Sequence, residues 1–358
     1  MPSFYRMALV LGYSFRVAMS VLLAGLVLEC GSRLVHLNAR PMIPSARGDD
    51  GTVKMVPNIA MNVRLPGQSV VKLFTDSSGA RVADVENLLP PPTVLVVGDS
   101  QALGWGLEFS QTFASKIAAR LFGDNRGARI LAAAATDPES IRPWARILTS
   151  RQRTPYRLRI ISVNLGNDLD EMVLGRGSIS RPALGKVVEW LGTNSILFLD
   201  VTLLRFRLFG EPWGIPPGTN PVLFFLKKAE YETMVWAVAE AIVKLSRDLP
   251  DGDETIIVLI PNDTQVDPRE IEKYATLYPS ASSFEGWRGR ANDSAQRLRL
   301  IEEKLNEQLT QRGFVVVEPL FGMQHAPAEK LFYRTSHHLT DEGHSLVADS
   351  IINQLKRD

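Results

Sequence analysis

Residues 93–100 read Thr-Val-Leu-Val-Val-Gly-Asp-Ser, a short apolar run that ends directly in a tight-turn tripeptide. Similar runs rich in Val, Ile and Leu recur along the chain, with longer amphipathic segments between them. Continuous apolar runs are typical of strands buried on both faces of a parallel sheet. We therefore predict strands at Thr93–Val97, Ala128–Ala132, Leu158–Leu165, Thr255–Ile260 and Phe314–Glu318.

Amphipathic helices are predicted between these strands. The segments Glu232–Leu249 and Ser294–Arg312 each place their apolar residues on one stripe, and they stop at Pro250 and Gly313. A last helix is predicted to follow Thr340, a plausible N-cap residue. The alternation predicts an α/β fold with a mostly parallel sheet covered on both faces, in which ligands bind beyond the carboxyl ends of the strands.

The composition excludes several classes of function. The chain has 358 residues, 45% of them hydrophobic, and a net charge of +1. Without a basic field, a nucleic-acid partner has no electrostatic support. The one cysteine forms no internal disulfide and supplies no cysteine-rich zinc site.

The N-terminal segment Met7–Leu28 contains a single charge, Arg16, and is long enough to cross a bilayer. An alternative register uses Val17 to Leu37. We predict a single-pass membrane anchor over residues 1–37, with the N-terminus inside and the bulk of the chain outside the cytoplasm. A cleaved signal peptide and a buried core helix remain open alternatives.

The rest of the chain divides into two predicted parts. Residues 38–92 are interpreted as a juxtamembrane linker with a hairpin, formed by residues 61–65 and 70–74 around Pro66-Gly67. Residues 93–358 form the α/β domain. An insertion at 175–228 interrupts it and either covers the site, leans on the membrane or adds core packing.

Two polar segments follow predicted strands and converge at one sheet edge. Ser100 follows the first strand within Gly98-Asp99-Ser100, where a helix N-terminus would favour developing negative charge. Asn167 follows the third strand, and its amide can donate to an oxyanion, although a turn-stabilising asparagine is the simpler interpretation.

Three of the five histidines fall within residues 336–344. A metal site is not predicted, because the adjacent His337 and His338 diverge on a regular element and no carboxylate cluster accompanies them. A histidine just before a helix N-cap is instead well placed as a general base for Ser100.

The blocks Gly98-Asp99-Ser100, Gly166-Asn167-Asp168 and His338-Leu339-Thr340 with Gly343-His344 resemble, in this order, the SGNH (GDSL-type) hydrolase superfamily. The resemblance covers Pro57 to Ile352 and is closest to bacterial membrane-anchored members. It implies a flavodoxin-like three-layer α/β/α sandwich without cofactor or metal. It also implies Ser100 as nucleophile, His338 as base, and an oxyanion hole formed by Ser100, Ala135 and Asn167.

The sequence departs from the family pattern twice. Ala135 stands where the family has a glycine, and the aspartate that usually precedes the histidine is replaced by Thr335 and Ser336. Such an aspartate orients the imidazole and stabilises its charged form. Three alternatives follow: a hydroxyl, carbonyl or remote carboxylate orients the ring, His337 occupies the position, or activity is lost.

The resemblance therefore predicts an esterase or O-acyltransferase that acts on acyl esters of a carbohydrate through an acyl-Ser100 intermediate. Another acyl substrate, such as a lipid or thioester, is an alternative. So is an inactive binding or assembly subunit of a cell-envelope or exopolysaccharide system. The expected location is the bacterial cytoplasmic membrane with the domain periplasmic, together with a membrane-bound acyltransferase partner.

Overall fold

The computed structural model describes the chain in sections, and the account below is confined to them. They are residues 2–35, 45–47, 53–64, 69–84, 92–133, 137–151, 154–166, 168, 228–270, 291–334 and 338–357.

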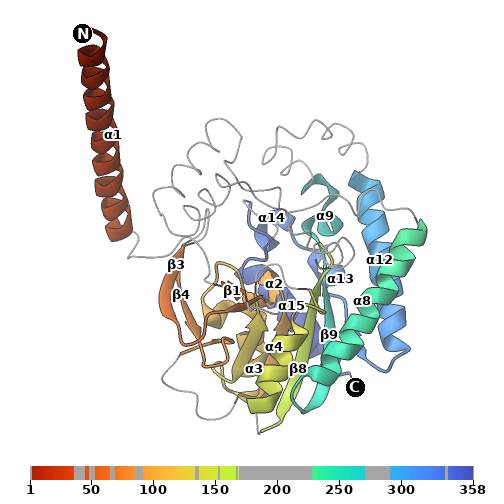
Figure 1. Cartoon of the computed structure of the whole chain (residues 1–358). Helices are drawn as coiled ribbons and strands as arrows, with labels where there is room; N and C mark the ends of the chain where they lie inside the picture. The colour runs from red at the N-terminus through yellow and green to blue at the C-terminus, as the bar shows by residue number, and fades with distance from the viewer. Residues whose placement is uncertain are drawn as a thin grey trace.

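An eight-stranded sheet forms the centre of the molecule, with the strand order β10-β9-β8-β6-β7-β5-β4-β3 (Figure 1). The five strands from β6 to β10 are mutually parallel, which confirms the predicted α/β fold with a mostly parallel sheet. Their order is 2-1-3-4-5, that of flavodoxin-like folds. Their bounds are β6 Val94–Gly98, β7 Ala128–Ala132, β8 Tyr156–Asn164, β9 Gly252–Ile260 and β10 Val315–Val317.

The predicted hairpin is present and is joined to the same sheet. Strand β3 (Ala60–Arg64) pairs antiparallel with β4 (Val70–Thr75), which pairs with β5 (Arg81–Val82). Strand β5 then pairs antiparallel with β7, Arg81 lying opposite Ile130. The sheet is therefore mixed, and its antiparallel part brings Arg81 beside the parallel core.

Helices cover both faces of the parallel strands. Because the strand order reverses after β7, right-handed crossovers place α3 on one face and α4, α8 and α12 on the other. Helix α15 packs on α3, while α8 packs on both α4 and α12. Thr340 caps α15 as predicted, its hydroxyl accepting the N–H of Gly343 at 3.2 Å. The bounds are α3 Phe113–Phe122, α4 Arg142–Arg151, α8 Lys228–Asp248, α12 Ala291–Thr310 and α15 Asp341–Leu355.

Short elements occupy the loops at the carboxyl edge of the sheet and its surroundings. They are the helices α2 Ser100–Leu103, α9 Asp263–Val266, α13 Leu320–Met323 and α14 Ala328–Leu331, and the 3-10 turns η1 Phe109–Gln111 and η3 Pro268–Glu270. A separate two-stranded pair joins β1 Ser45–Arg47 to β2 Val53–Met55.

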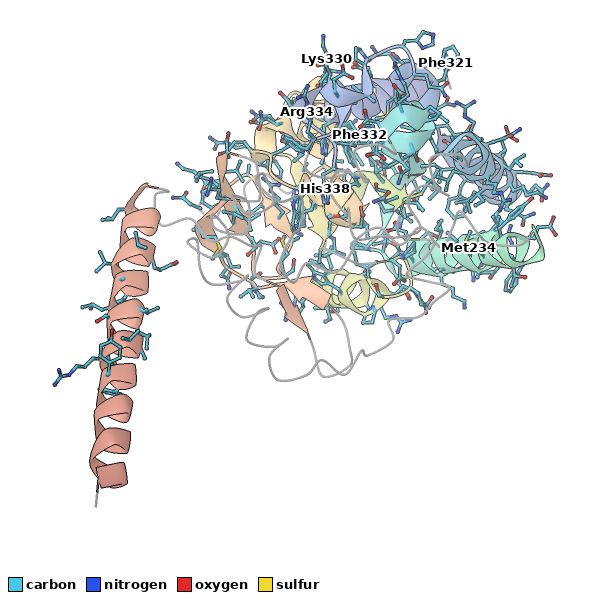
Figure 2. The ribbon with its side chains drawn as sticks, turned by 90° about the horizontal axis from the view of Figure 1, so that it is seen from above. Met234, Phe321, Lys330, Phe332, Arg334 and His338 are labelled. Atoms are coloured by element: carbon cyan, nitrogen blue, oxygen red, sulfur yellow. The ribbon has the colours of Figure 1, made fainter. Side chains whose placement is uncertain are left out.

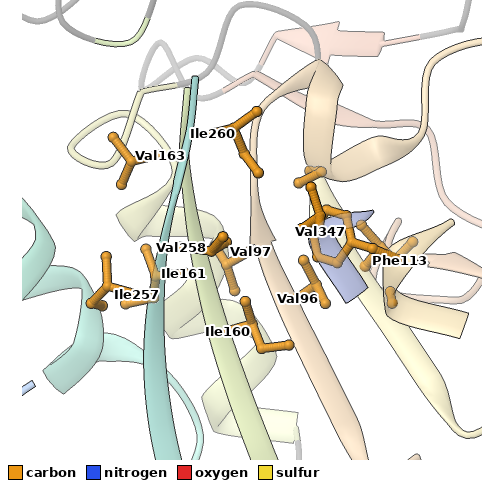
Figure 3. Close-up of a cluster of buried hydrophobic side chains, with 14 of the residues drawn as sticks. Val96, Val97, Phe113, Ile160, Ile161, Val163, Ile257, Val258, Ile260 and Val347 are labelled. Atoms are coloured by element: carbon orange, nitrogen blue, oxygen red, sulfur yellow. The ribbon is translucent and has the colours of Figure 1, made fainter. Parts of the chain in front are cut away.

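The hydrophobic core lies between the sheet and the helices on its two faces. Side chains of β6, β8 and β9 interdigitate in it with Phe113 from α3 and Val347 from α15 (Figure 3). All four residues Val94–Val97 are fully buried, as the continuous apolar run predicts. A strand fixed in this way holds the residue that follows it at a defined place on the sheet edge.

Helix α1 (Pro2–Val35) stands apart from the sheet (Figure 1). Among the described residues no helix combines the length and the apolar character that crossing a membrane requires, so the predicted transmembrane helix is not supported. The predicted insertion at 175–228 lies outside the described residues, except for Lys228 at the start of α8.

Candidate active site

Ser100 lies at the carboxyl end of β6, as the first residue of helix α2. A glycine precedes this turn for a steric reason, since a β-carbon on Gly98 would lie 2.8 Å from the Ala102 side chain. Asp99 caps the helix, its carboxylate accepting the N–H of Gln101 at 2.9 Å. Ser100 is 5% exposed, so the turn holds a nearly buried hydroxyl at the sheet edge.

His338 meets Ser100 across this edge, with 2.9 Å between the imidazole Nε2 and the serine Oγ. For the hydroxyl to donate to Nε2, the ring must be neutral with its proton on Nδ1. The indole of Trp105 stacks on the imidazole, with ring centroids 5.1 Å apart and planes 12° from parallel. His338 lies near the middle of the domain when the carboxyl edge is seen from above (Figure 2). The geometry lets a serine proton pass to the imidazole.

The segment that carries His338 is held by the nucleophile's own helix. The N–H of Leu339 donates to the side-chain oxygen of Gln101 at 3.0 Å. On the other side, the N–H of Tyr333 donates to the carbonyl of His338 at 2.9 Å. Because Gln101 directly follows Ser100, this bond ties the histidine segment to the nucleophile turn.

A buried polar network ties the turn after β6 to the turn after β8. The amide Nδ2 of Asn164 donates to Asp99 at 2.8 Å, and its Oδ1 accepts the N–H of Gly166 at 2.9 Å. The N–H of Asn164 donates to the Asp168 carboxylate at 2.8 Å. Burial raises the pKa of Asp99, and the hydrogen bond from Asn164 is the largest effect opposing that rise. The network therefore fixes the turn after β6 relative to the turn after β8.

Arg81 holds the loop that follows α2. Its guanidinium donates to three carbonyls, those of Leu103 at 2.6 Å, Gly104 at 3.0 Å and Leu107 at 2.5 Å. The side chain is 1% exposed, and burial lowers its pKa to about 10, with the Glu108 carboxylate opposing the effect. A buried cation thus satisfies carbonyls at and after the end of the nucleophile helix.

His344 belongs to the core and not to the site. Its Nδ1 accepts the N–H of Phe113 at 3.0 Å, and the two rings stack with centroids 5.4 Å apart. Burial, reinforced by the positive charges of Lys116 and Arg81, lowers the pKa of His344 to about 3. No group of three His, Cys, Asp or Glu side chains suited to a metal is found among the described residues.

Five of the predicted site residues lie outside the described part of the chain. These are Ala135 and Asn167, assigned to the oxyanion hole, and Thr335, Ser336 and His337, assigned to orienting or replacing the base. The roles given to them stay predictions. The two residues that the structure does describe, Ser100 and His338, are brought into direct contact although 238 positions separate them.

Sequence reasoning did not single out Asn164, Gln101 or Trp105 for any role. A weak signal existed for Asn164, a polar residue at the end of an otherwise apolar strand. No role was predicted for Arg81 either. These residues contact partners that are distant in the sequence. Asn164 and Asp99, for example, are 65 positions apart.

Neither a family model nor a curated protein matches the chain in sequence. Solved structures do match in shape. A GDSL-like lipase from Bacteroides thetaiotaomicron shares 10% identity, covering 74% of this chain and 87% of its own, with a TM-score of 0.37. A putative acylhydrolase from Bacteroides fragilis shares 11%, covering 77% and 97%, with a TM-score of 0.38. An acetylxylan esterase from Geobacillus stearothermophilus shares 8%, covering 74% and 94%, with a TM-score of 0.35.

What this chain itself provides is the order of its blocks, a 2-1-3-4-5 parallel core, and a serine after the first core strand that meets a histidine from the segment before the last helix. In these respects the chain resembles the SGNH hydrolases.

Proposed function

We propose that the chain is a serine esterase that forms an acyl ester on Ser100. The observation that carries the proposal is the 2.9 Å contact between Ser100 Oγ and His338 Nε2 at the carboxyl edge of the sheet. A hydroxyl of ordinary pKa is a weak nucleophile, and an adjacent imidazole activates it by accepting its proton. Ligands of open α/β sheets bind at this edge.

The reaction has two steps that use the same histidine. Ser100 Oγ attacks the ester carbonyl carbon while its proton passes to Nε2 of His338, and the imidazolium then protonates the departing alcohol. Next, His338 accepts a proton from the acceptor, whose oxygen attacks the acyl-Ser100 carbonyl, and the imidazolium returns the proton to Ser100. Water as acceptor gives hydrolysis, and a sugar hydroxyl gives O-acyl transfer.

The tetrahedral oxyanion needs hydrogen-bond donors in place before the reaction. We assign this role to the N–H of Ser100, the amide of Ala135 and the side chain of Asn167. Support for the third comes from the bonds of Asn164 to Gly166 and to Asp168, the two neighbours of Asn167. The choice of a carbohydrate acyl ester rests on the resemblance of the motifs alone.

Labelling with a fluorophosphonate probe, followed by peptide mass spectrometry, tests the proposal together with p-nitrophenyl acetate turnover. We expect the label on Ser100 and loss of both label and turnover in Ser100→Ala. Ser150→Ala is the matched control, because Ser150 is an exposed helical serine whose hydroxyl bonds only locally, to the carbonyl of Ile147. It should keep both signals.

Two results would count against this function. Full turnover in Ser100→Ala would remove Ser100 as nucleophile. A folded protein with neither label nor turnover would favour the inactive binding or assembly subunit. Transfer of the acetyl group to an added oligosaccharide, measured against release of free acetate, separates O-acyltransferase from esterase.

We also propose that α1 attaches the protein to a lipid bilayer, with the domain on the extracytoplasmic side. Large apolar side chains are exposed at consecutive positions 21–23 and 26–28, which cover every side of a helix. Helices apolar all round are buried in a core or in a membrane, and the described residues supply no core that covers these side chains. Flotation with vesicles should carry the protein upward, and Leu22→Asp with Leu26→Asp should abolish flotation. Unchanged flotation of the double variant would overturn the attachment.

A further inference from the structure

A hollow of about 310 Å³ opens between α12 and α13, away from the Ser100–His338 contact. It lies beyond the carboxyl end of β10, the edge strand, and β6 is three strands away, or about 14 Å at the usual strand spacing. Phe321, which lines it, lies at the periphery of the view in which His338 is near the middle (Figure 2). The lining residues are Arg299, Glu302, Glu303, Glu318, Leu320, Phe321 and Gln324.

Glu302 lines the hollow and is only 3% exposed. One of its oxygens accepts the side-chain N–H of Gln265 at 3.0 Å. The other, Oε1, is buried and has no hydrogen-bond partner among the residues that the structure describes. A buried carboxyl oxygen without a partner is costly to keep, so a ligand that supplies a donor would be favoured there.

The protonation state of this carboxyl depends on its surroundings. Burial, followed by the Glu318 carboxylate, raises the pKa of Glu302 to about 8. Three charged groups face it: Glu303 raises its pKa, as Glu318 does, while the Arg299 guanidinium lowers it. Gln265 donates to it from α9. Near neutral pH the group is mostly protonated, and a nearby cation would drive the proton off.

One aromatic residue, Phe321, lines the hollow. The ring of Phe321 is 76% exposed, which is uncommon for a phenylalanine in a folded domain. It meets the His325 ring edge-on with centroids 4.9 Å apart, and His325 Nδ1 lies 2.7 Å from the Phe321 carbonyl. An aromatic ring beside carboxylates can bind an organic cation, because the ring face attracts the positive charge and packs against the carbon chain.

We propose that this hollow binds an organic cation, whose ammonium or guanidinium group is held between Glu302 and Glu318 and whose carbon chain packs on Phe321. A metal ion is disfavoured, because no three side chains among the described residues are arranged to ligate one. With three carboxyl groups and one guanidinium in the lining, the hollow is negative when they are ionised. Its volume suits a small molecule or a single side chain.

Binding is balanced by the release of a proton. The cationic group that enters brings one positive charge, Glu302 loses its proton to the buffer, and the ion pair between the two is neutral; the second cationic group of agmatine keeps its own proton throughout. Isothermal titration with agmatine at pH 7, in phosphate and in Tris, measures this proton through the different ionisation enthalpies of the two buffers. We expect release approaching one proton per agmatine, and less at pH 9, where Glu302 is already ionised.

Four variants sharpen the test. Glu302→Gln keeps the shape and should weaken agmatine at least tenfold and abolish proton release. Glu307→Gln, an exposed residue of the same helix that does not line the hollow, is the matched control and should change neither. Phe321→Leu should weaken binding severalfold, and Arg299→Gln should tighten it because a competing cation is removed. Circular dichroism checks that each variant is folded.

Binding of other compounds, compared with that of agmatine, defines the chemistry that the hollow recognises. Butanol and butyrate should not bind, since neither carries a positive charge. If the blocked peptide Gly-Arg-Gly binds as tightly as agmatine, the cation can come from a protein side chain, whereas binding of agmatine alone indicates a free small molecule. Equal affinity of the parent protein and Glu302→Gln for agmatine, or no binding at tens of millimolar agmatine, would overturn the proposal. The binding assay needs no catalytic turnover, so its outcome does not depend on whether the chain is an esterase.

Discussion

His338 and His344 lie six residues apart, on either side of the start of α15, and their surroundings are opposite. His338 is partly exposed, and its Nε2 contacts the Ser100 hydroxyl. His344 is fully buried in the first turn of α15, its Nδ1 accepting a backbone N–H from α3. The same side chain thus serves one region as the proposed proton acceptor of Ser100 and the other as a neutral cap for a helix.

The difference shows what a histidine needs for each role. A general base must reach the proton it removes and must titrate near the working pH. A structural histidine needs only an acceptor nitrogen and a place for its ring, and burial then keeps it neutral by lowering the pKa to about 3. A count of histidines in a sequence window does not separate these cases, whereas their positions relative to a helix N-cap do.

The largest effect is expected at His338. His338→Ala removes the proton acceptor of Ser100, so kcat/KM should fall by about 10²–10⁴-fold, the usual contribution of a general base. His344→Asn keeps an acceptor for the Phe113 N–H and should change kcat/KM by less than about tenfold. Steady-state kinetics on p-nitrophenyl acetate compare the two. Equal losses would mean that the two regions do not differ in function.

Arg81 acts on both regions and should give the next largest effect. Arg81→Met takes the guanidinium donors from three buried carbonyls, of which that of Gly104 still accepts the N–H of Leu107 at 3.1 Å. The free energy of unfolding should therefore fall by about 3 kcal/mol. The positive charge also helps to lower the pKa of His344, which should therefore rise in this variant.

Urea unfolding and an NMR titration of the histidine ring measure the two consequences of Arg81→Met. Arg81→Lys should recover part of the lost stability, because an ammonium reaches some of the carbonyls. Arg151→Met is the control, since Arg151 is exposed and bonds one carbonyl at 3.3 Å. A stability of Arg81→Met equal to that of the control would show that the buried bonds contribute little.

The sequence predicted the parts of this comparison that depend on local pattern. Apolar runs located the strands, Thr340 marked the start of the last helix, and the motif blocks located Ser100 and His338. The eight-stranded extent of the sheet was not predicted, because pairing of β5 with β7 depends on contacts between distant residues. The burial of the Arg81 guanidinium could not be predicted either. Its partners are backbone carbonyls, which every residue has and which leave no signal in the sequence.

A variant of Asn164 tests how the nucleophile turn is held in place. Its effect should be smaller than those of the His338 and Arg81 variants. Asn164→Ala takes a donor from the buried Asp99 carboxylate, which should cost about 2 kcal/mol of stability and raise the pKa of Asp99 further. If the network positions the reacting groups, kcat should fall about tenfold with little change in KM.

Two further variants separate positioning by Asn164 from plain destabilisation. Asn164→Gln can still donate and should recover part of kcat. Asn306→Ala removes a half-buried asparagine that bonds Glu318, and kcat should be unaffected. A loss of stability in Asn164→Ala with unchanged kcat would assign the network to folding alone.

The smallest effect at neutral pH is expected from His344, and it should appear only in acid. The folded pKa of about 3 lies below the unfolded value of 6.5, so the unfolded chain binds a proton that the folded chain refuses. The stability contributed by the neutral ring is complete above pH 6.5 and is lost as the pH falls toward 3.

The sign of this linkage sets the measurement. Between pH 7 and pH 5 the unfolding free energy of the parent protein should drop by about 1–2 kcal/mol more than that of His344→Asn, which has no titrating ring. Above pH 7 the two curves should run parallel. His338→Asn is the matched control, because His338 lies in a partly exposed segment and contributes no such buried cap. Parallel curves at all pH values would mean that His344 is hydrated, and the contrast between the two histidines would then be one of position and not of protonation.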